Sequence, residues 1–168
     1  LYFESIHPFE DGNGRVGRAI SECALSQALA HPSLTGISSV IAQERGDYYD
    51  ALERANRDNE ITEWLRYFGD VVLDGQARSL RFVRFLVEKT RFLDRLRGAL
   101  NPRQEKALLR MLREGPDGFE GGLSAGNYIT ITGAPPATAR RDLGALVELG
   151  ALRRTGEKRG TRYWLALG

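Results

Sequence analysis

Residues 7–18, HPFEDGNGRVGR, bring a histidine, two carboxylates, three glycines and two arginines into one short segment. Glycines let backbone N–H groups turn toward a ligand, because they carry no Cβ atom. The start of a helix adds the partial positive charge of its unpaired amides. A helix that begins inside this glycine loop would therefore bind an anion, and phosphate is the natural choice.

The polar residues of the same segment indicate what could be done with a phosphate. Arg15 and Arg18, both expected in the first helical turn, are unfavourable to the helix dipole unless an anion lies there. Asp11 is a hard oxygen ligand suited to Mg²⁺, and Asn13 with the loop amides could hold a phosphate. His7 can take a proton from a hydroxyl near neutral pH. The combination predicts transfer of a phosphate-linked group.

A second interpretation of the loop is a dinucleotide site. Gly12, Gly14 and Gly17 formally match the G-x-G-x-x-G pattern. That site requires a strand, helix and strand in succession and an acidic residue about 20 positions later. The chain after residue 47 has a helical pattern and no series of apolar strands. The context therefore disfavours this interpretation.

The segment resembles the motif of the Fic family, H-x-F-x-[D/E]-G-N-G-R-x-x-R, at every defined position from His7 to Arg18. The later stretches RGDYYDALERA and ITEWLRYF are similar to the downstream helices of Fic domains, so the resemblance covers about residues 1–97. It implies a helical Fic bundle and transfer of AMP from ATP to a hydroxyl of a target protein. Glycine at position 14, where kinase-like relatives have lysine, favours adenylylation over phosphorylation.

The resemblance also implies a role for each matching residue. His7 would deprotonate the target hydroxyl, Phe9 would anchor the loop in the core, and Asp11 would hold Mg²⁺. The residues that would line the phosphate site or bind the β- and γ-phosphates are Gly12, Asn13, Gly14, Arg15 and Arg18.

The chain begins six residues before His7, whereas Fic domains carry helices and a β-hairpin flap ahead of the motif. We therefore expect an N-terminally truncated Fic domain, with the activity of this chain alone left open. Leu1, Phe3 and Ile6 would then lack covering helices, which suggests a homodimer as a hypothesis.

Composition and periodicity predict a mainly α-helical chain. With 42% hydrophobic and 27% charged residues, the 168 residues should fold. The apolar spacing after Arg18 predicts a helix that starts inside the glycine loop and ends at His31-Pro32. Further helices are predicted to begin at Ile37 and Asp47. A long helix or a pair follows over residues 61–97, with a bend at Gly75. Trp64 should lie in the core, and one of Tyr48 and Tyr49 should be buried while the other is exposed.

Asn101-Pro102 indicates a boundary, because a potential helix cap precedes a proline and the charge balance changes sign there. Residues 1–100 hold 13 Lys/Arg against 15 Asp/Glu, and residues 101–168 hold 11 against 7. We expect a Fic portion over residues 1–97, a linker over 98–102 and a second domain over 103–168. There, three helices and a two-stranded ribbon predict a winged helix-turn-helix.

The second domain leaves two interpretations open. Basic residues on its last helix and its wing could contact DNA, and the candidates are Thr138, Arg140, Arg141, Lys158 and Arg159. The same face could instead contact protein. Accordingly, the alternative to the enzyme is a DNA-binding transcriptional regulator with a vestigial Fic half.

The lone Cys23, expected on the packed side of its helix, excludes an internal disulfide and favours a reducing compartment. The sequence shows neither a membrane-spanning run nor a targeting pattern, so we predict a cytoplasmic protein with no membrane partner.

Overall fold

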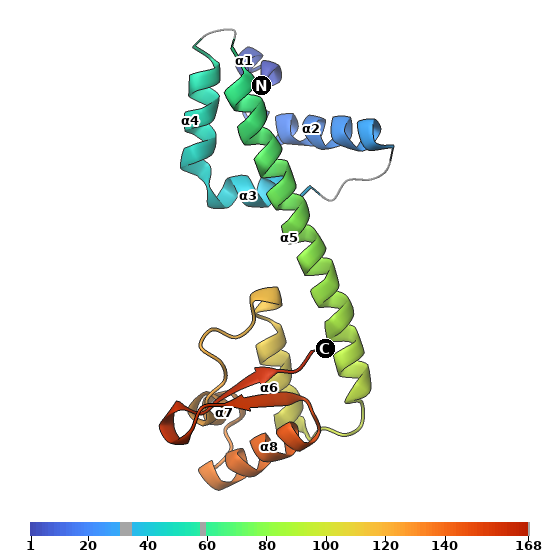
Figure 1. Cartoon of the computed structure of the whole chain (residues 1–168), viewed down its shortest axis with the longest axis vertical. Helices are drawn as coiled ribbons and strands as arrows, with labels where there is room; N and C mark the ends of the chain where they lie inside the picture. The colour runs from blue at the N-terminus through green and yellow to red at the C-terminus, as the bar shows by residue number, and fades with distance from the viewer. Residues whose placement is uncertain (31–34, 58–59, 168) are drawn as a thin grey trace. The chain divides into compact units, whose positions relative to one another are not determined.

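The computed structural model describes residues 1–30, 35–57 and 60–167 of the chain. These residues form a mainly α-helical protein with one small two-stranded antiparallel sheet (Figure 1), which confirms the expected fold class. The chain divides into two compact units, Leu1–Arg81 (unit 1) and Phe82–Gly168 (unit 2). The linker expected at residues 98–102 stays a prediction.

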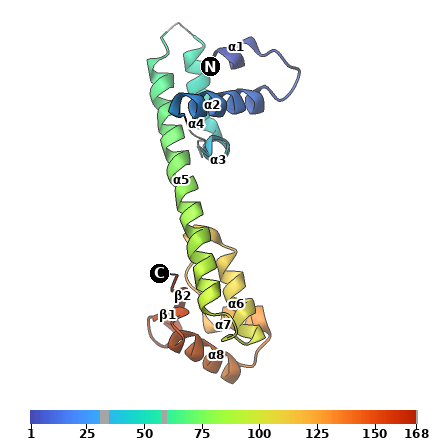
Figure 2. The ribbon, with the colours of Figure 1, turned by 90° about the vertical axis from the view of Figure 1, so that its right-hand side faces the viewer.

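Unit 1 is built from helices around the first part of a long helix. In both views, α2, α3 and α4 lie beside the beginning of α5 (Figures 1 and 2). The bounds are α1 Tyr2–Ile6, α2 Asn13–Leu29, α3 Ile37–Gln43, α4 Arg45–Ala55 and α5 Thr62–Arg95. Trp64 and Tyr48 are buried in this core and Tyr49 is exposed, as the sequence predicted.

Helix α5 is continuous through Gly75, so the residues expected to form a long helix or a pair form one long helix. The bend expected at Gly75 stays a prediction. Gly75 allows a close approach of backbones. A Cβ atom at this position would lie 1.8 Å from the carbonyl oxygen of Thr35. The absence of a side chain at position 75 therefore lets the backbone of Thr35, just before α3, pack directly against α5.

Unit 2 contains α6 Pro102–Leu112, α7 Ala125–Thr132 and α8 Pro136–Glu148, followed by β1 Leu152–Thr155 and β2 Arg162–Leu165. Its core also takes Phe85, Phe92 and Leu96 from the last turns of α5. Asn101 caps α6 as expected, and its side chain accepts the N–H groups of Arg103 and Gln104.

The two strands form a hairpin with Leu152 opposite Leu165 and Thr155 opposite Arg162. Its turn contains the short 3₁₀ helix η2 Lys158–Gly160, and a second one, η1 Gly115–Asp117, follows α6. Gly156 has a φ of 72°, and a Cβ atom there would lie 2.4 Å from the carbonyl oxygen of Gly160. Glycine is thus required where the turn folds back on itself.

Three further expectations differ from the structure. Cys23 is exposed on α2, so its expected packing role is wrong. Leu1 packs against the core of unit 1 and Phe3 is partly buried, which leaves Ile6 as the exposed member of that apolar group. Helix α2 ends at Leu29, and the expected stop at His31-Pro32 lies outside the described residues.

Among the residues that the structure describes, no helix has the length and apolar character needed to cross a membrane.

Candidate functional site

The first turn of α2 is built to be electropositive. Gly12 is its N-cap residue, with a φ of 85° that glycine adopts readily, and it provides no side-chain cap. The turn contains no acidic residue. Its unpaired amides therefore keep their partial positive charge, as the sequence predicted for a helix that starts inside the glycine loop.

Asn13 fixes the loop in front of this helix. Its side-chain oxygen accepts the backbone N–H of Phe9 at 3.0 Å, and its side-chain nitrogen donates to the Phe9 carbonyl oxygen at 2.5 Å. Asn13 is 2% exposed, although it is polar. Buried polar groups of this kind are stabilising when they are paired. Asn13 thus holds the backbone of the loop in place, and its predicted contact with a nucleotide stays a prediction.

Asp11 and Arg15 lie together at the surface beside Gly12. A carboxylate oxygen of Asp11 accepts from the Gly12 N–H at 2.6 Å, and the other lies 3.3 Å from Arg15 Nη2. The Asp11 side chain is 93% exposed and that of Arg15 is 74% exposed. An exposed pair of this kind contributes less than about 1 kcal/mol, so both side chains are available to a ligand.

Arg18 lies in the second turn of α2, not in the first as expected. Its Nε donates to the Ser38 hydroxyl of α3 at 3.2 Å. A Cβ atom on Gly14 would lie 3.2 Å from Arg18 Nη1, so the guanidinium folds back over the glycine. The structure thereby brings a second cation to the start of α2. Ser38 was not identified from the sequence, where it is one of several ordinary helix serines.

His7 is the C-cap residue of α1 and is exposed, with a left-handed φ of 50°. Only two peptide units separate it from the loop that Asn13 holds. Phe9 is 51% exposed, and its ring centroid lies 6.2 Å from that of Phe3. The expectation that Phe9 is anchored in the core is wrong for this chain, where the backbone of Phe9 fastens the loop instead.

Glu4 and Tyr48 also lie close to the start of α2, and the proximity of Glu4 to Tyr48 was not identified from the sequence. Glu4 Oε1 is buried without a hydrogen-bond partner among the described residues, and a Cβ atom on Gly17 would lie 2.5 Å from it. Burial raises the pKa of the Tyr48 hydroxyl, and the Glu4 carboxylate adds to this rise while Arg18 opposes it. Because α1 and α4 bring these groups together, no local spacing revealed them.

The part of the chain that the structure describes holds no group of three or more His, Cys, Asp or Glu residues able to bind a metal ion by themselves. Mg²⁺ in nucleotide sites is commonly held by one or two carboxylates, water and the phosphates of the substrate. The exposed carboxylate of Asp11 beside the electropositive turn fits that kind of binding.

In unit 2, a groove of about 1010 Å³ lies between α7, α8 and the hairpin. Of the residues predicted to contact DNA, Arg140, Lys158 and Arg159 line it. Thr138 is half-buried and Arg141 is exposed, and both lie on α8 outside the lining. Arg154 and Arg162 complete the cations of the groove.

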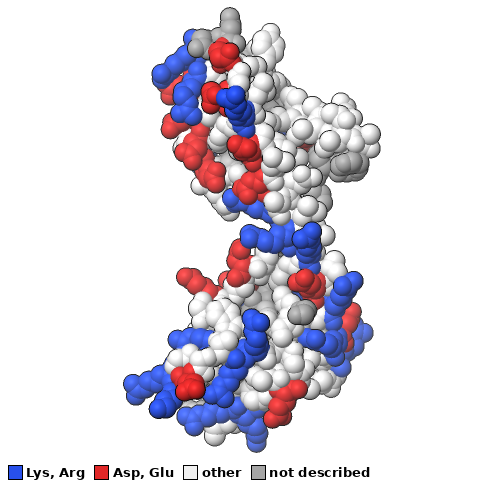
Figure 3. Space-filling view, in the orientation of Figure 1, with Lys and Arg blue, Asp and Glu red and all other residues white. Residues whose placement is uncertain are grey.

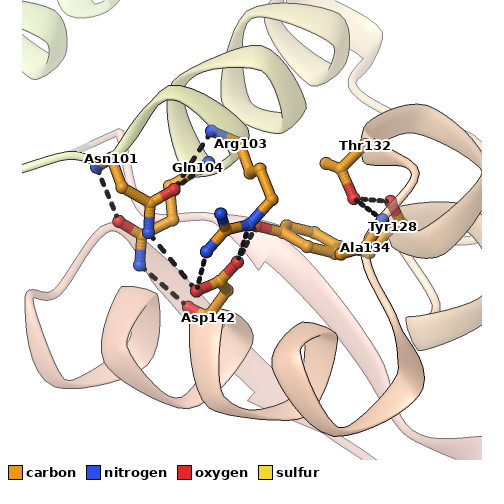
Figure 4. A network of polar contacts seen from close by, with 7 residues as sticks. All are labelled: Asn101, Arg103, Gln104, Tyr128, Thr132, Ala134 and Asp142. Atoms are coloured by element: carbon orange, nitrogen blue, oxygen red, sulfur yellow. Dashed lines mark hydrogen bonds and ion pairs between the residues drawn. The ribbon is translucent and has the colours of Figure 1, made fainter.

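A buried carboxylate holds α8 to the helices beside it (Figure 4). Asp142 accepts from Arg103 Nε at 2.8 Å, Asn101 Nδ2 at 3.3 Å and the Tyr128 hydroxyl at 3.1 Å. Its carbonyl oxygen also accepts from Gln104 Nε2 at 3.2 Å. The Arg103 guanidinium lowers the pKa of Asp142, and burial together with the Asp142 hydrogen bond raises the pKa of Tyr128. The side chains that bind the Asp142 carboxylate are 14 to 41 residues from it in the sequence, so no local pattern predicted this cluster.

The fold and the site together define a class of helical protein. In this class a helix begins at a glycine cap, two arginines and an aspartate lie near its first turn, and an exposed histidine comes just before them in the sequence. Residues 1–25 match the Fic/DOC family. The chain is also similar to a protein adenylyltransferase Fic of Nematostella vectensis, with 37% identity over 62 residues. Both findings support the resemblance to the Fic family that the motif at residues 7–18 indicates.

The match covers 37% of this chain and 13% of the length of the Nematostella protein. The chain therefore corresponds to a small part of that relative.

Proposed function

We propose that the start of α2 binds the phosphates of ATP and serves the transfer of AMP to a hydroxyl side chain of a target protein. The observation that carries this proposal is the first turn of α2, which has a glycine cap, no acidic residue and Arg15 within it. Such a turn attracts a polyanion. The match to the Fic/DOC family and the name of the Nematostella relative support transfer of a nucleotide as the chemistry.

In the proposed reaction, the imidazole of His7 removes the proton from the target hydroxyl. The hydroxyl oxygen then attacks the α-phosphorus of ATP, and the bond from that phosphorus to the oxygen bridging to the β-phosphate breaks. The target oxygen leaves carrying AMP, and pyrophosphate is released. Arg15 and Arg18 neutralise the charge on the β- and γ-phosphates, which grows on the departing group.

The backbone at the helix start positions the phosphates. The unpaired amides of the first turn would bind the anion, and Asn13 keeps the loop fixed through its two hydrogen bonds to Phe9. A larger residue at position 14 would displace the Arg18 guanidinium, which lies 3.2 Å from the position of its Cβ atom. By the resemblance to the Fic family, in which kinase-like members have lysine at this position, glycine favours AMP transfer over phosphorylation.

Asp11 would hold Mg²⁺ against the phosphates. When bound, the ion would offset their negative charge and orient them. The Arg15 side chain, 3.3 Å from Asp11, would exchange its exposed ion pair for the phosphates as the nucleotide enters.

The test is label transfer by the longest natural polypeptide that contains these residues. ATP labelled at the α-phosphate should label a protein of a cell extract, and ATP labelled at the γ-phosphate should not. His7→Ala and Arg18→Ala should abolish the label. Arg57→Ala is the matched control, because Arg57 forms a similarly exposed pair with Glu53 four residues earlier. Label that persists without His7, or that comes from the γ-phosphate, would overturn the proposal.

A second proposal concerns unit 2, which we take to be a winged helix-turn-helix module with α8 as its second helix and the hairpin as its wing. The order of three helices and a hairpin supports it, as does the left-handed Gly133 that ends α7 just before α8. The alternative function, a regulator with a vestigial Fic half, is disfavoured by the relative named as an adenylyltransferase. A cytoplasmic location and a homodimer remain predictions.

A further inference from the structure

We propose that the groove of unit 2 binds the phosphate backbone of duplex DNA without regard to base sequence, an activity separate from nucleotide transfer at α2. The groove of about 1010 Å³ is formed by the start of α7, by α8 and by the hairpin turn. Its ionised side chains are Arg140, Arg154, Lys158, Arg159, Arg162 and a single carboxylate, Glu148.

The charge is concentrated in this part of the chain. Residues 121–168 contain seven Lys/Arg and three Asp/Glu. One of the three acids, Asp142, is buried and paired with Arg103, so it adds little negative potential at the surface. Lys and Arg side chains gather around the hairpin end of unit 2 in the space-filling view (Figure 3). Clustered cations of this kind attract nucleic acid.

The cations on the hairpin are held in place by the backbone. Gly156 and the 3₁₀ turn Lys158–Gly160 fold the tip into one tight conformation. Arg162 Nη1 donates to the carbonyl oxygens of Arg159 and Thr161 at 3.2 and 2.9 Å. Lys158 and Arg159 are therefore presented from a fixed turn, which lowers the entropy lost when they meet phosphates.

The exposed face of α8 favours contact with the backbone of DNA over reading of bases. Ala137 and Gly144 are exposed on this face near Arg140 and Arg141. A Cβ atom on Gly144 would meet no atom within 4 Å. Small side chains let a helix approach a phosphate ladder closely, but they offer no hydrogen bonds to base edges. The expected binding is consequently independent of sequence.

The lining also favours a nucleic acid over an acidic protein segment. Protein partners are usually anchored by large apolar or aromatic side chains in the centre of an interface. Here the large apolar side chains are Val147 and Tyr163, both only partly buried in unit 2. Apart from the carboxylate of Glu148, the remaining lining is basic, small or hydroxylic. An extended row of phosphates matches cations spread over a helix and a hairpin.

The test compares two triple variants of the whole chain by fluorescence anisotropy with short labelled DNA duplexes of unrelated sequence. The groove variant carries Arg154→Ala, Lys158→Ala and Arg159→Ala. The control variant carries Arg91→Ala, Lys106→Ala and Arg113→Ala. It removes the same charge from side chains of unit 2 that lie outside the groove lining. Circular dichroism melts verify that both variants fold.

The wild type should bind duplexes of different sequence equally, with an affinity that falls steeply between about 50 and 200 mM salt. The groove variant should bind at least about tenfold more weakly. The slope of log affinity against log salt concentration should also become shallower by about two to three, because each lost phosphate contact removes about 0.9. The control should stay within about twofold of the wild type. Polyglutamate should compete poorly.

Three outcomes would overturn the proposal: no binding at low salt, an equal loss in both variants, or displacement by polyglutamate at the same charge concentration. The last would assign the surface to acidic protein segments. Label transfer from ATP by His7-dependent chemistry is measured separately, so failure of one proposal leaves the other standing.

Discussion

Replacing Asp142 by alanine should destabilise unit 2 more than a typical surface substitution. The Asp142 side chain is 5% exposed and connects α8 to Asn101, Arg103 and Tyr128. Its removal leaves the Tyr128 hydroxyl without its partner in a residue that is 0% exposed. Since α8 also carries Arg140, the substitution should loosen one wall of the basic groove.

The expected cost combines two contributions. A buried hydroxyl that loses its hydrogen-bond partner costs about 1–3 kcal/mol. Arg103 is 41% exposed and can regain water, so the loss of its ion pair adds little to the cost. We therefore expect about 1–3 kcal/mol for Asp142→Ala, most of it from the Tyr128 hydroxyl. Asp142→Asn keeps an acceptor for Tyr128 and should cost about half as much.

Native-state hydrogen exchange of the α8 amides measures this free energy within unit 2, whatever the stability of unit 1. Glu148→Gln, an exposed carboxylate at the end of the same helix, is the matched control and should change the value by less than about 0.5 kcal/mol. In the double variant Asp142→Ala/Tyr128→Phe, the orphaned hydroxyl is gone, so the cost should be smaller than the sum of the single costs by about 1 kcal/mol. Strict additivity, or a cost for Asp142→Ala no larger than for Glu148→Gln, would refute the reasoning.

Three other predictions follow from individual contacts. Because Arg103 lowers the pKa of Asp142 in the folded state, this carboxylate stabilises unit 2 fully above its unfolded pKa of about 4 and loses that effect as the pH falls through the lower folded value. Asp142→Asn should abolish this part of the acid dependence in hydrogen exchange, and an unchanged profile would contradict it. Gly75→Ala should destabilise unit 1 by about 1–3 kcal/mol in exchange of the α3 amides, because its Cβ atom meets the Thr35 carbonyl oxygen. Gly69→Ala on the same helix meets no atom within 4 Å and should stabilise by about 0.5–1 kcal/mol, so equal effects of the two would disprove the packing argument. Asn13→Ala should remove the exchange protection of the Phe9 amide and cost about 2 kcal/mol for two partly buried hydrogen bonds, whereas retained protection would show that the loop is held by other contacts.

Local features could be predicted from the sequence because their causes are local. Asn101 followed by proline predicted the start of α6, and the structure adds Gln104, whose side chain accepts the Asn101 backbone N–H. The glycine loop predicted where α2 begins, and the structure makes Gly12 its N-cap residue. These signals depend on neighbours within a few residues and need no knowledge of the rest of the fold.

The features that escaped prediction depend on distant segments. The residues around Gly75 in the sequence all favour a helix and give no reason for a glycine. The reason is the backbone of Thr35, which lies where a side chain at position 75 would be. The cluster at Asp142 assembles three helices, and a lone aspartate in α8 gives no local sign of its partners. Cys23 was placed on the packed side by apolar spacing alone, although the surface of α2 that it occupies is left uncovered by the described residues. Periodicity identifies a face, but tertiary packing decides whether it is covered.

The most direct test of the central claim is a titration of the nitrogen-labelled chain with ATP and Mg²⁺, followed by amide and arginine side-chain resonances. If the start of α2 holds the phosphates, the largest shifts should occur at the amides of Gly12, Asn13 and Gly14 and at the side chains of Arg15 and Arg18. They should disappear in the Arg15→Ala/Arg18→Ala variant but persist in Arg57→Ala. Unchanged resonances there at millimolar ATP, or shifts confined to the basic groove of unit 2, would contradict the assignment.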